Sequence, residues 1–473
     1  MVCLWFVLVL LTLLPASQST NAGVKVRLTQ KALEYGRQIG ITVLQQKLKT
    51  IKVPDFSGPT GRRRIGKVKY DLTELQVVSV GLPKSAVRLV PGTSVKFSIR
   101  NAFIKMHGNW RVKYMLVGGN GFFDVSVNNL TIATSIAIRK NAIGRPAVNS
   151  AGCSATVGSA KIKFRDGADW LYKHLHSFAG KVLRKVLEKK ICPLVAETIS
   201  DMNLHLETLN VLAEVDKHAE IEYSMVASPV ISKEFIDLSL KGEFYNIGQH
   251  REPPFSPTPF SLPPQNSSML YIGLSAFTVN SAAFVYHTAG ALSLYITDDM
   301  IPSLSPIRLN TKTFGRYIPQ IAKMYPGLMM KVLVKTANVP IITFQPDKLI
   351  LQASSTVTAY AIQPNTTLSP LFVLNLDVNV SARIYVTGLK VAGSMTLNSI
   401  DMTLGTSYVG PFQVKSLQRT FTTALKWVVV PMVNVNLGKG YPLPAIGKMN
   451  LTNLQLQVLQ DYTLIGTDLN FTG

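Results

Sequence analysis

Cysteine, acidic side chains and long apolar runs are all scarce in this 473-residue chain. After residue 14, no stretch reaches the roughly 18 apolar residues that a membrane-spanning helix needs. Pro431 interrupts the nearest approach, Trp427 to Val433. The G-x-S-x-G, H-E-x-x-H and C-x-x-C patterns and the phosphate-cradling P-loop are also missing, and these motifs place catalytic nucleophiles, metals or phosphates. The absences argue against an enzyme and predict neither a cofactor nor a metal site.

The amino terminus has the organisation of a secretory signal peptide. Val2 to Leu14 forms an apolar run that is too short to span a membrane, and Ser17-Gln18-Ser19 supplies the small residues of a cleavage site. The run departs from the usual pattern because no Lys or Arg precedes it. We expect residues 1–19 to be a signal peptide and the mature protein to be secreted into the extracellular space.

Removing the signal peptide leaves two cysteines, Cys153 and Cys192. In an oxidising compartment, two cysteines favour a single disulfide. The alternatives are a metal site and a catalytic thiol. Clustered histidines that could complete a metal site are missing, and pairing would consume the thiol. We therefore predict a Cys153–Cys192 disulfide.

Six Asn-x-Ser/Thr sequons fit the same compartment. One sequon arises often by chance, whereas six in a secreted chain predict that some carry glycans. The predicted glycosylation sites are Asn129, Asn266, Asn365, Asn379, Asn450 and Asn470.

Positive charge is concentrated in the first 200 residues. They contain 31 basic and 9 acidic residues, a net charge of +22, whereas residues 201–473 contain 18 and 17, a net charge of +1. This asymmetry predicts an anionic partner. The candidates are nucleic acid, heparin-like glycans, anionic lipid surfaces and lipopolysaccharide phosphates. Aromatic residues make up only 8% of the chain, and they do not interleave with the basic residues as in single-strand-binding proteins, so we expect no nucleic acid partner.

A proline-rich segment divides the chain into halves of comparable length. Six prolines between Pro253 and Pro264 predict an extended, semi-rigid linker. A similar turn and strand pattern occurs in each half: Pro91-Gly92 precedes residues 95–102, and Pro326-Gly327 precedes residues 330–337. We therefore predict two domains of one plan, at residues 20–245 and 268–473, joined by a linker at residues 246–267.

Most of the chain alternates apolar and polar residues with period two, which is typical of half-buried antiparallel strands in curled sheets or barrels. Two segments have helical spacing instead. Residues 29–51 carry an apolar stripe with Thr29 as a possible cap, and residues 169–202 carry a second stripe that includes Ile191 and Val195. Cys192 falls on the second helix, so the disulfide would join this helix to the preceding strand region.

Two groups of basic residues stand beside glycines and are candidates for anion binding. Arg62, Arg63, Arg64, Lys67 and Lys69 form the first group; Lys105, Arg111 and Lys113 form the second. Guanidinium groups bind phosphate oxygens bidentately and ammonium groups add compact charge. The alternative interpretation is a solvated, charged loop. The surrounding excess of positive charge favours a functional role.

Seven segments along the chain, together with their order and spacing, resemble the family of bactericidal/permeability-increasing protein and lipopolysaccharide-binding protein. This family is related to the plasma lipid transfer proteins. The cysteine pair and the proline-rich segment also stand where the family has them. The segments are Gly23 to Lys31, Ile51 to Asp55, Lys96 to Ile99, Lys241 to Tyr245, Asp298 to Pro302, Gly410 to Phe412 and Gly440 to Pro444.

The resemblance implies an α+β fold: an elongated boomerang of two similar curved antiparallel β-barrel domains with long helices, joined by a central sheet beside the linker. It also implies an apolar pocket for phospholipid in each domain. The basic tip of the first domain would bind the lipid A part of lipopolysaccharide. The chain departs from lipopolysaccharide-binding members at Tyr114, Met115 and Gly118, where those members carry more basic residues.

The resemblance predicts a secreted innate-immunity protein that acts on the outer membrane surface of Gram-negative bacteria. A phospholipid transfer or carrier protein is the alternative, although the charge asymmetry argues against it because neutral lipid in a pocket needs no such field. A third hypothesis is an extracellular protein that binds heparin-like glycans.

Overall fold

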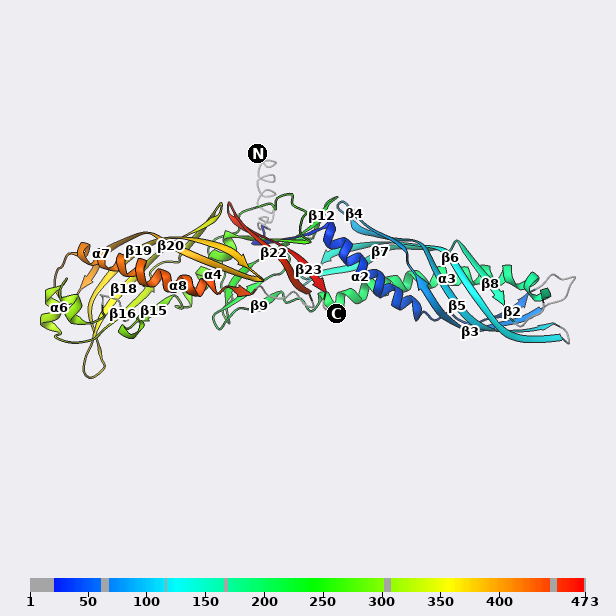
Figure 1. Cartoon of the computed structure of the whole chain (residues 1–473), viewed down its shortest axis with the longest axis horizontal. Coiled ribbons are helices and arrows are strands. Elements are labelled where there is room, and N and C mark those ends of the chain that lie inside the picture. Colours follow the sequence, from blue (N-terminus) through cyan, green and yellow to red (C-terminus); the bar gives the residue numbers. More distant parts are fainter. Residues whose placement is uncertain are drawn as a thin grey trace, which may run out of the picture. The chain divides into compact units, whose positions relative to one another are not determined.

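A computed structural model describes residues 21–60, 68–114, 117–165, 169–301, 308–442 and 449–471. The chain forms two compact units (Figure 1). The first unit comprises Leu28–Leu209 and Ser228–Asp237, and the second comprises Met1–Arg27, Asn210–Ala227 and Leu238–Gly473. The expected signal peptide, residues 1–19, lies outside the described residues, and the expected domain borders stay a prediction.

The first unit is built from one large antiparallel sheet and two long helices. The helices are α2 (Gln30–Lys49) and α3 (Asp169–Leu206). Later in the sequence, β11 (Val230–Ile231) and β12 (Phe235–Leu240) form a short antiparallel hairpin. The first unit includes this hairpin as far as Asp237. The strands of the large sheet are β2 (Phe56–Thr60), β3 (Val68–Gly81), β4 (Lys84–Val90), β5 (Ser94–Tyr114), β6 (Val117–Lys140), β7 (Pro146–Thr156) and β8 (Ser159–Phe164).

The sheet of the first unit is curved but open, which corrects the expectation of a closed barrel. Its strand order is β2-β3-β5-β6-β7, so β2 and β7 are edges among the described residues. The two longest strands each pair with two shorter ones in succession: β5 pairs with β4 and then β3, and β6 pairs with β8 and then β7. Among the described residues, no pairing joins β2 or β4 on one side of the sheet to β7 or β8 on the other, so the sheet stays open. Helices α2 and α3 contribute buried side chains to the core that covers its inner face.

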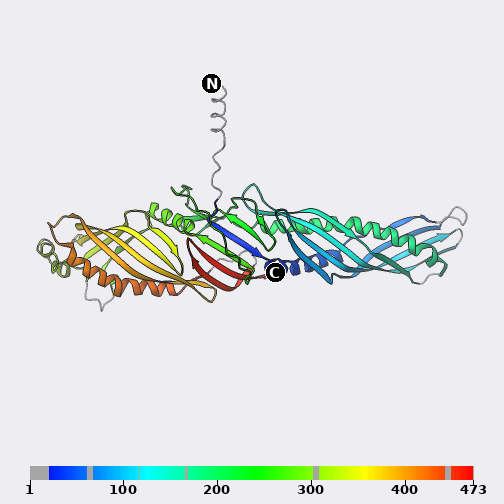
Figure 2. The ribbon, with the colours of Figure 1, turned by 90° about the horizontal axis from the view of Figure 1, so that it is seen from above.

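The two predicted helices are confirmed. Figures 1 and 2 show α3 running along β7 and β8. The buried stripe of α3 differs in detail from the predicted one: Leu183 and Leu187 are buried, whereas Met202 is 48% exposed. Helix α2 begins after its N-cap residue Thr29 and buries Leu44 and Leu48 against the same core.

Ionic and polar contacts hold the two helices in place. Lys47 of α2 forms ion pairs with Glu197 and Asp201 of α3, and the hydrogen bond with Asp201 raises the pKa of Lys47. The side chain of Asn203 bonds both the backbone N–H and the carbonyl of Val148 in β7, at 2.8 and 2.9 Å. The carboxyl end of α3 is therefore anchored to the sheet.

The second unit contains several sheets and shorter helices. Its large sheet has the order β15-β16-β18-β19-β20-β21, with β17 paired to β18, and β13-β10-β9 form a small sheet. The strands β1, β14, β23 and β22 lie side by side in that order. The strands are β1 (Val24–Thr29), β9 (Leu212–Glu214), β10 (Ala219–Glu222), β13 (Glu243–Asn246), β14 (Leu270–Ser275), β15 (Ser293–Ile296), β16 (Met330–Thr336), β17 (Ile341–Gln345), β18 (Lys348–Ile362), β19 (Leu368–Thr387), β20 (Lys390–Ser407), β21 (Tyr441–Pro442), β22 (Met449–Leu459) and β23 (Tyr462–Phe471).

The helices of the second unit include one that is interrupted by a wider turn. Helix α7 (Val414–Ala424) continues through a π-helical turn, η2 (Leu425–Val429), into α8 (Val430–Gly438), and Figure 1 shows this segment beside β20. The other helical elements are α4 (Ala276–Thr288), η1 (Asp298–Met300), α5 (Thr311–Gly315) and α6 (Pro319–Met324).

The proline-rich segment contains neither helix nor strand, and its carboxyl-terminal part is packed against strands of the second unit. Leu262 is buried with Tyr271 of β14 and Leu464 of β23. Pro263 accepts a hydrogen bond of 2.8 Å from the guanidinium of Arg27, and the Phe260 ring packs on Tyr462. These contacts tie this part of the segment to the sheet.

The repeated Pro-Gly pattern has a common structural basis. Gly92 and Gly327 both adopt positive φ angles, of 73° and 71°, a backbone conformation that favours glycine. Each turn stands shortly before a strand, β5 in the first unit and β16 in the second. The shared sequence pattern therefore corresponds to a shared turn and strand in each half of the chain.

Candidate functional site

Four of the eight cations predicted to bind an anion are among the described residues, and they lie on the outer face of the first unit's sheet. Strand β5 alternates: Ile104, Met106, Trp110 and Val112 are buried at 4% exposure or less, so the residues between them face outward. The exposed cations of this face that the sequence predicted are Lys105, Arg111 and Lys113 on β5 and Lys69 on β3.

Strand pairing places these cations in neighbouring rows. Lys69 stands directly opposite Lys113, and Lys105 is opposite Ser126 of β6. Like charges placed opposite each other on a sheet disfavour the fold by roughly 0.2–1 kcal/mol per pair. The Lys69–Lys113 pair thus concentrates positive potential that a bound anion would relieve.

Two further cations belong to this face and were missed from the sequence. Lys161 and Lys163 are exposed on β8, where Lys161 stands opposite Ser126 and therefore in the same row as Lys105. The period-two pattern Lys161-Ile162-Lys163-Phe164 could have revealed them. We call the six cations the strand-face cluster: Lys69, Lys105, Arg111, Lys113, Lys161 and Lys163.

Most acidic charge on this face is already engaged. Asp124 contacts His107 Nδ1 at 3.0 Å and accepts a hydrogen bond of 2.6 Å from Arg165 Nε. The hydrogen bond with His107, assisted by Arg165, holds the pKa of Asp124 below its usual range. Asp71 stands opposite Arg111. Within the described part of the chain, no carboxylate lies within ion-pair distance of the strand-face cluster, so its charge is available to a ligand.

The first predicted basic group falls mostly outside the described residues, which omit Arg62, Arg63, Arg64 and Lys67. The two residues that border this segment, Thr60 of β2 and Val68 of β3, are paired. Lys69, next to Val68, stands opposite Lys113 at the end of β5. Thr60 and Val68 therefore lie near the end of the sheet where Tyr114 of β5 pairs with Val117 of β6.

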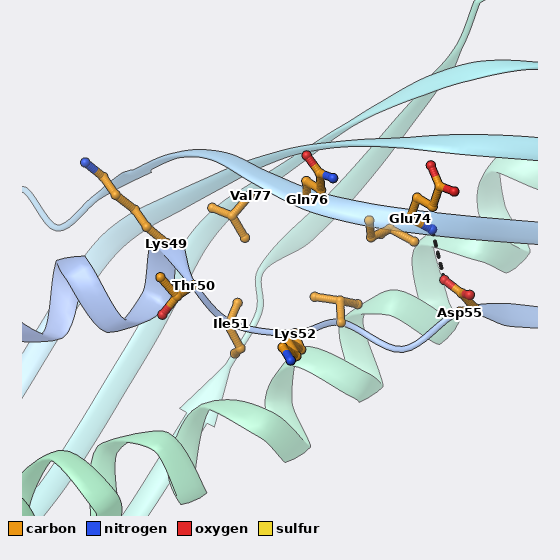
Figure 3. A pocket seen from close by; sticks show the side chains of 10 residues that line it. Lys49, Thr50, Ile51, Lys52, Asp55, Glu74, Gln76 and Val77 are labelled. Carbon is orange, nitrogen blue, oxygen red and sulfur yellow. Dashed lines mark hydrogen bonds between the residues drawn. The ribbon is translucent and has the colours of Figure 1, made fainter.

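A cleft of about 500 Å³ opens beside the carboxyl end of α2 (Figure 3). Its lining combines apolar Ile51, Val53, Leu75 and Val77 with charged side chains that include Lys49 and Lys52. A hydrogen bond of 2.9 Å from the Glu74 backbone N–H to Asp55 closes one side. Its size is within the range of small-molecule sites, and its lining combines apolar side chains with two lysines and two carboxylates, Asp55 and Glu74.

Comparison with known proteins places the whole chain in one family. The model of the LBP / BPI / CETP family, N-terminal domain, matches residues 32–206, and that of the C-terminal domain matches residues 213–471. The chain belongs to the LBP / BPI / CETP family.

Individual relatives agree with this assignment. The chain is 65% identical to bactericidal permeability-increasing protein of Sebastes schlegelii, over 100% of this chain and 99% of that protein. It is 34% identical to lipopolysaccharide-binding protein of Mus musculus, over 95% and 94% of the two chains. A crystal structure of lipopolysaccharide binding protein matches with a TM-score of 0.64 and 32% identity, covering 96% of this chain and 100% of the other. These names describe no enzyme, in agreement with the missing catalytic motifs.

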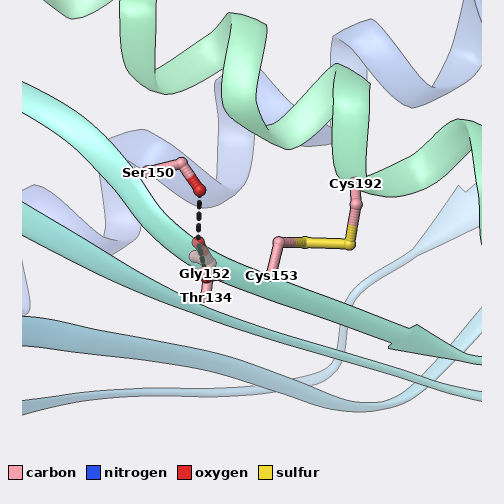
Figure 4. The surroundings of a disulfide bond; sticks show 5 residues. All are labelled: Thr134, Ser150, Gly152, Cys153 and Cys192. Atoms are coloured by element: carbon pink, nitrogen blue, oxygen red, sulfur yellow. Dashed lines mark hydrogen bonds between the residues drawn. A yellow bond between two sulfur atoms is a disulfide. The ribbon is translucent and has the colours of Figure 1, made fainter.

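The disulfide predicted for this family member is confirmed. Cys153 of β7 and Cys192 of α3 are bonded, with 5.7 Å between their Cα atoms (Figure 4). Nearby, the Thr134 hydroxyl donates to the carbonyl of Gly152 at 3.0 Å. The bond therefore joins the long helix to the sheet that carries the strand-face cluster, as the sequence predicted.

All six sequon asparagines are among the described residues of this LBP / BPI / CETP family member. Among the described helices, none is both long and apolar enough to cross a bilayer. Five sequon asparagines are exposed, and Asn379 is half-buried, with Oδ1 accepting a hydrogen bond from Asn398. Glycosylation at these positions stays a prediction. The exposed sequon residues are Asn129, Asn266, Asn365, Asn450 and Asn470.

Proposed function

We propose that the chain is a secreted innate-immunity protein that binds the lipid A part of lipopolysaccharide and acts against Gram-negative bacteria. The observation that carries this proposal is the strand-face cluster, which gathers six cations on one exposed face of the sheet. Asp71 stands opposite Arg111 and Asp124 opposite Lys163, but among the described residues neither carboxylate forms an ion pair with a cation of the cluster. Relatives named for lipopolysaccharide binding and bactericidal action support it.

The proposed mechanism begins with electrostatics. Lys105, Arg111 and Lys113 would engage the lipid A phosphates, because guanidinium and ammonium groups form strong charge-assisted hydrogen bonds with phosphate oxygens. Competition by these cations would displace the divalent ions that bridge neighbouring phosphates in the bacterial outer membrane. We include Arg62, Arg63, Arg64 and Lys67 in the proposed binding surface, together with Lys69.

Apolar contacts would follow the electrostatic encounter. We propose that acyl chains of lipopolysaccharide or phospholipid enter apolar pockets of the two domains. The cleft beside α2 is one candidate entrance, since Val53 and Leu75 belong both to its lining and to the buried core of the first unit. Lys49 and Lys52 at the same cleft would hold the anionic headgroup.

The test is binding to lipopolysaccharide, compared with neutral phosphatidylcholine vesicles, at physiological salt. Replacing Lys105, Arg111 and Lys113 with Gln removes three cations, each worth about 1 kcal/mol at an anionic lipid surface. We expect the affinity for lipopolysaccharide to fall roughly 100-fold. This loss should become smaller as the salt concentration rises, because salt screens the contribution of each cation.

The matched control removes three exposed cations from the outer side of α3. Lys181, Lys185 and Lys189 are exposed, and their replacement with Gln changes the net charge by the same amount. An equal loss of affinity in both variants would show that binding depends on net charge rather than on this surface. Equal binding of the parent protein to both lipids would favour the phospholipid carrier.

A further inference from the structure

The helical segment α7–α8 of the second unit is fixed to the sheet along one side only. Gln418 Nε2 donates to the carbonyl of Ile400 at 2.9 Å, near the start of the segment. Near its end, the Asn434 amide bonds both the N–H and the carbonyl of Met395, at 2.7 and 3.0 Å. Among the described residues, β21 pairs with β20 only at Lys390 and Val391, so these amides satisfy groups of β20 beyond the described pairing with β21.

These contacts determine which side of the helical segment faces solvent. Leu417 is fully buried beside the anchoring residue Gln418. On the solvent side, Trp427 is 78% exposed, Val435 64% and Met432 51%. Exposed apolar side chains of this size, gathered on one element, indicate an interaction surface.

Cations accompany these apolar side chains on the same segment. Lys415, Arg419 and Lys426 are exposed, and none of them has an ion-pair partner among the residues that the structure describes. The sequence contains no Asp or Glu between Asp401 and Asp461, although the half of the chain after residue 200 is nearly neutral. The α7–α8 surface is thus a local cationic and apolar region, defined by Lys415, Arg419, Lys426, Trp427, Met432 and Val435.

This composition fits a lipid surface better than a protein partner. Interfacial helices place Trp and other apolar side chains at the headgroup level and Lys or Arg beside anionic lipid phosphates. Protein interfaces, by contrast, are depleted in Lys. The segment does not qualify as a spanning helix, and Pro431 sits in its first α8 turn.

We propose that the α7–α8 surface is a second lipid-binding surface, which lies flat on an anionic bilayer with Trp427 at the headgroup level. It belongs to the second unit and shares no residue with the strand-face cluster. Its ligand is the bilayer itself, recognised through negative charge and an accessible apolar boundary, so lipopolysaccharide is not required.

The experiment uses the full chain in which Lys105, Arg111 and Lys113 are replaced with Gln, so that binding through the first unit is weakened. Vesicles of phosphatidylglycerol and phosphatidylcholine, with brominated acyl chains as quenchers, report on tryptophan contact. We expect quenching that disappears in Trp427→Phe, a variant that keeps an aromatic side chain and removes the reporter.

Replacing Lys415, Arg419 and Lys426 with Gln is expected to weaken partitioning into these vesicles by roughly 100-fold, the scale for three cations at an anionic surface. The control variant Lys348→Gln with Leu389→Gln removes an exposed cation and a 55% exposed leucine elsewhere in the second unit, and should partition as the parent does.

Two results would overturn the proposal. One is quenching that persists in Trp427→Phe, which would place a different tryptophan at the bilayer. The other is a triple variant that partitions no more weakly than the control. Because lipopolysaccharide is absent from the vesicles, neither result depends on whether the strand-face cluster binds lipid A.

Discussion

Removing the Cys153–Cys192 disulfide should destabilise the first unit without displacing α3. The change is a double replacement, Cys153→Ala with Cys192→Ala, which leaves no unpaired thiol and suits the apolar surroundings of Cys153. Helix α3 would keep its other anchors, which include the buried side chain of Leu187 and the ion pairs to Lys47. We therefore expect a native fold with a smaller free energy of unfolding.

The magnitude follows from the length of chain that the bond closes. The two cysteines are separated by 39 residues, and loop-closure entropy for this length gives about 4 kcal/mol at 25 °C. Since about 1.4 kcal/mol corresponds to a tenfold change in an equilibrium constant, the unfolded population should rise by roughly a thousandfold. The loss is comparable with that of Leu187→Ala, for which about 2–5 kcal/mol is expected at a fully buried site.

Hydrogen exchange measured by mass spectrometry on peptides of β5, β6 and α3 tests this prediction, because it reports on the first unit separately from the second. Exchange through global opening should accelerate by the same factor in all three elements. Peptides of β18 and β19, in the second unit, provide the internal control.

The reasoning would be refuted by a change below tenfold in β5 and β6. That result would mean that the unfolded chain is already restricted between residues 153 and 192, so that the bond removes little entropy. Loss of protection in α3 alone would show instead that the disulfide holds the helix in place, against the packing argument.

Four further outcomes are expected. Gly36→Ala in α2, where an added Cβ meets nothing within 4 Å, should stabilise the protein by about 1 kcal/mol; Gly242→Ala should destabilise it in the same thermal unfolding assay, because φ is +60° and the new Cβ would lie 2.5 Å from Val24 Cγ2. Asp124→Asn should make the free energy of unfolding fall less steeply in acid. The lowered pKa of Asp124 gives stability that is present above its unfolded pKa of about 3.9 and is lost as pH falls through the folded value. Urea unfolding from pH 7 to pH 2 would measure this difference. Asn434→Ala should lower the free energy of unfolding by roughly 1–3 kcal/mol, since it leaves the backbone N–H and carbonyl of Met395 in β20 without this partner. Hydrogen exchange of the Met395 amide should then become faster.

Local patterns were sufficient for much of the fold. Helical spacing predicted α2 and α3 within a few residues, because an amphipathic stripe needs only neighbours along the chain. Period-two alternation likewise predicted that most of the chain forms antiparallel strands. The Cys153–Cys192 bond followed from counting cysteines once the compartment was inferred, and the concentration of charge in the first 200 residues needed no structure at all.

Nonlocal pairing decided the rest. Whether a sheet closes depends on which strands meet, and the branching of β5 and β6 left it open. Lys161 joined the row of Lys105 because both strands flank Ser126 of β6, a register that no local pattern contains. The Pro-rich segment was correctly expected to lack helix, but its packing on β23 depends on residues about 200 positions away.

The sequence by itself therefore determined the two long helices of the first unit, the disulfide and the sign and location of the charge, since each depends on residue type and short-range spacing. The helices of the second unit, among them α4, α7 and α8, were not predicted. The tertiary structure alone decided which cations share a face, which side of α7–α8 meets solvent and how Gln418 and Asn434 cover the edge of β20. The physical reason is that strand register and helix docking are set by the burial of side chains from distant parts of the chain, and they fix the direction in which each charged or apolar group points.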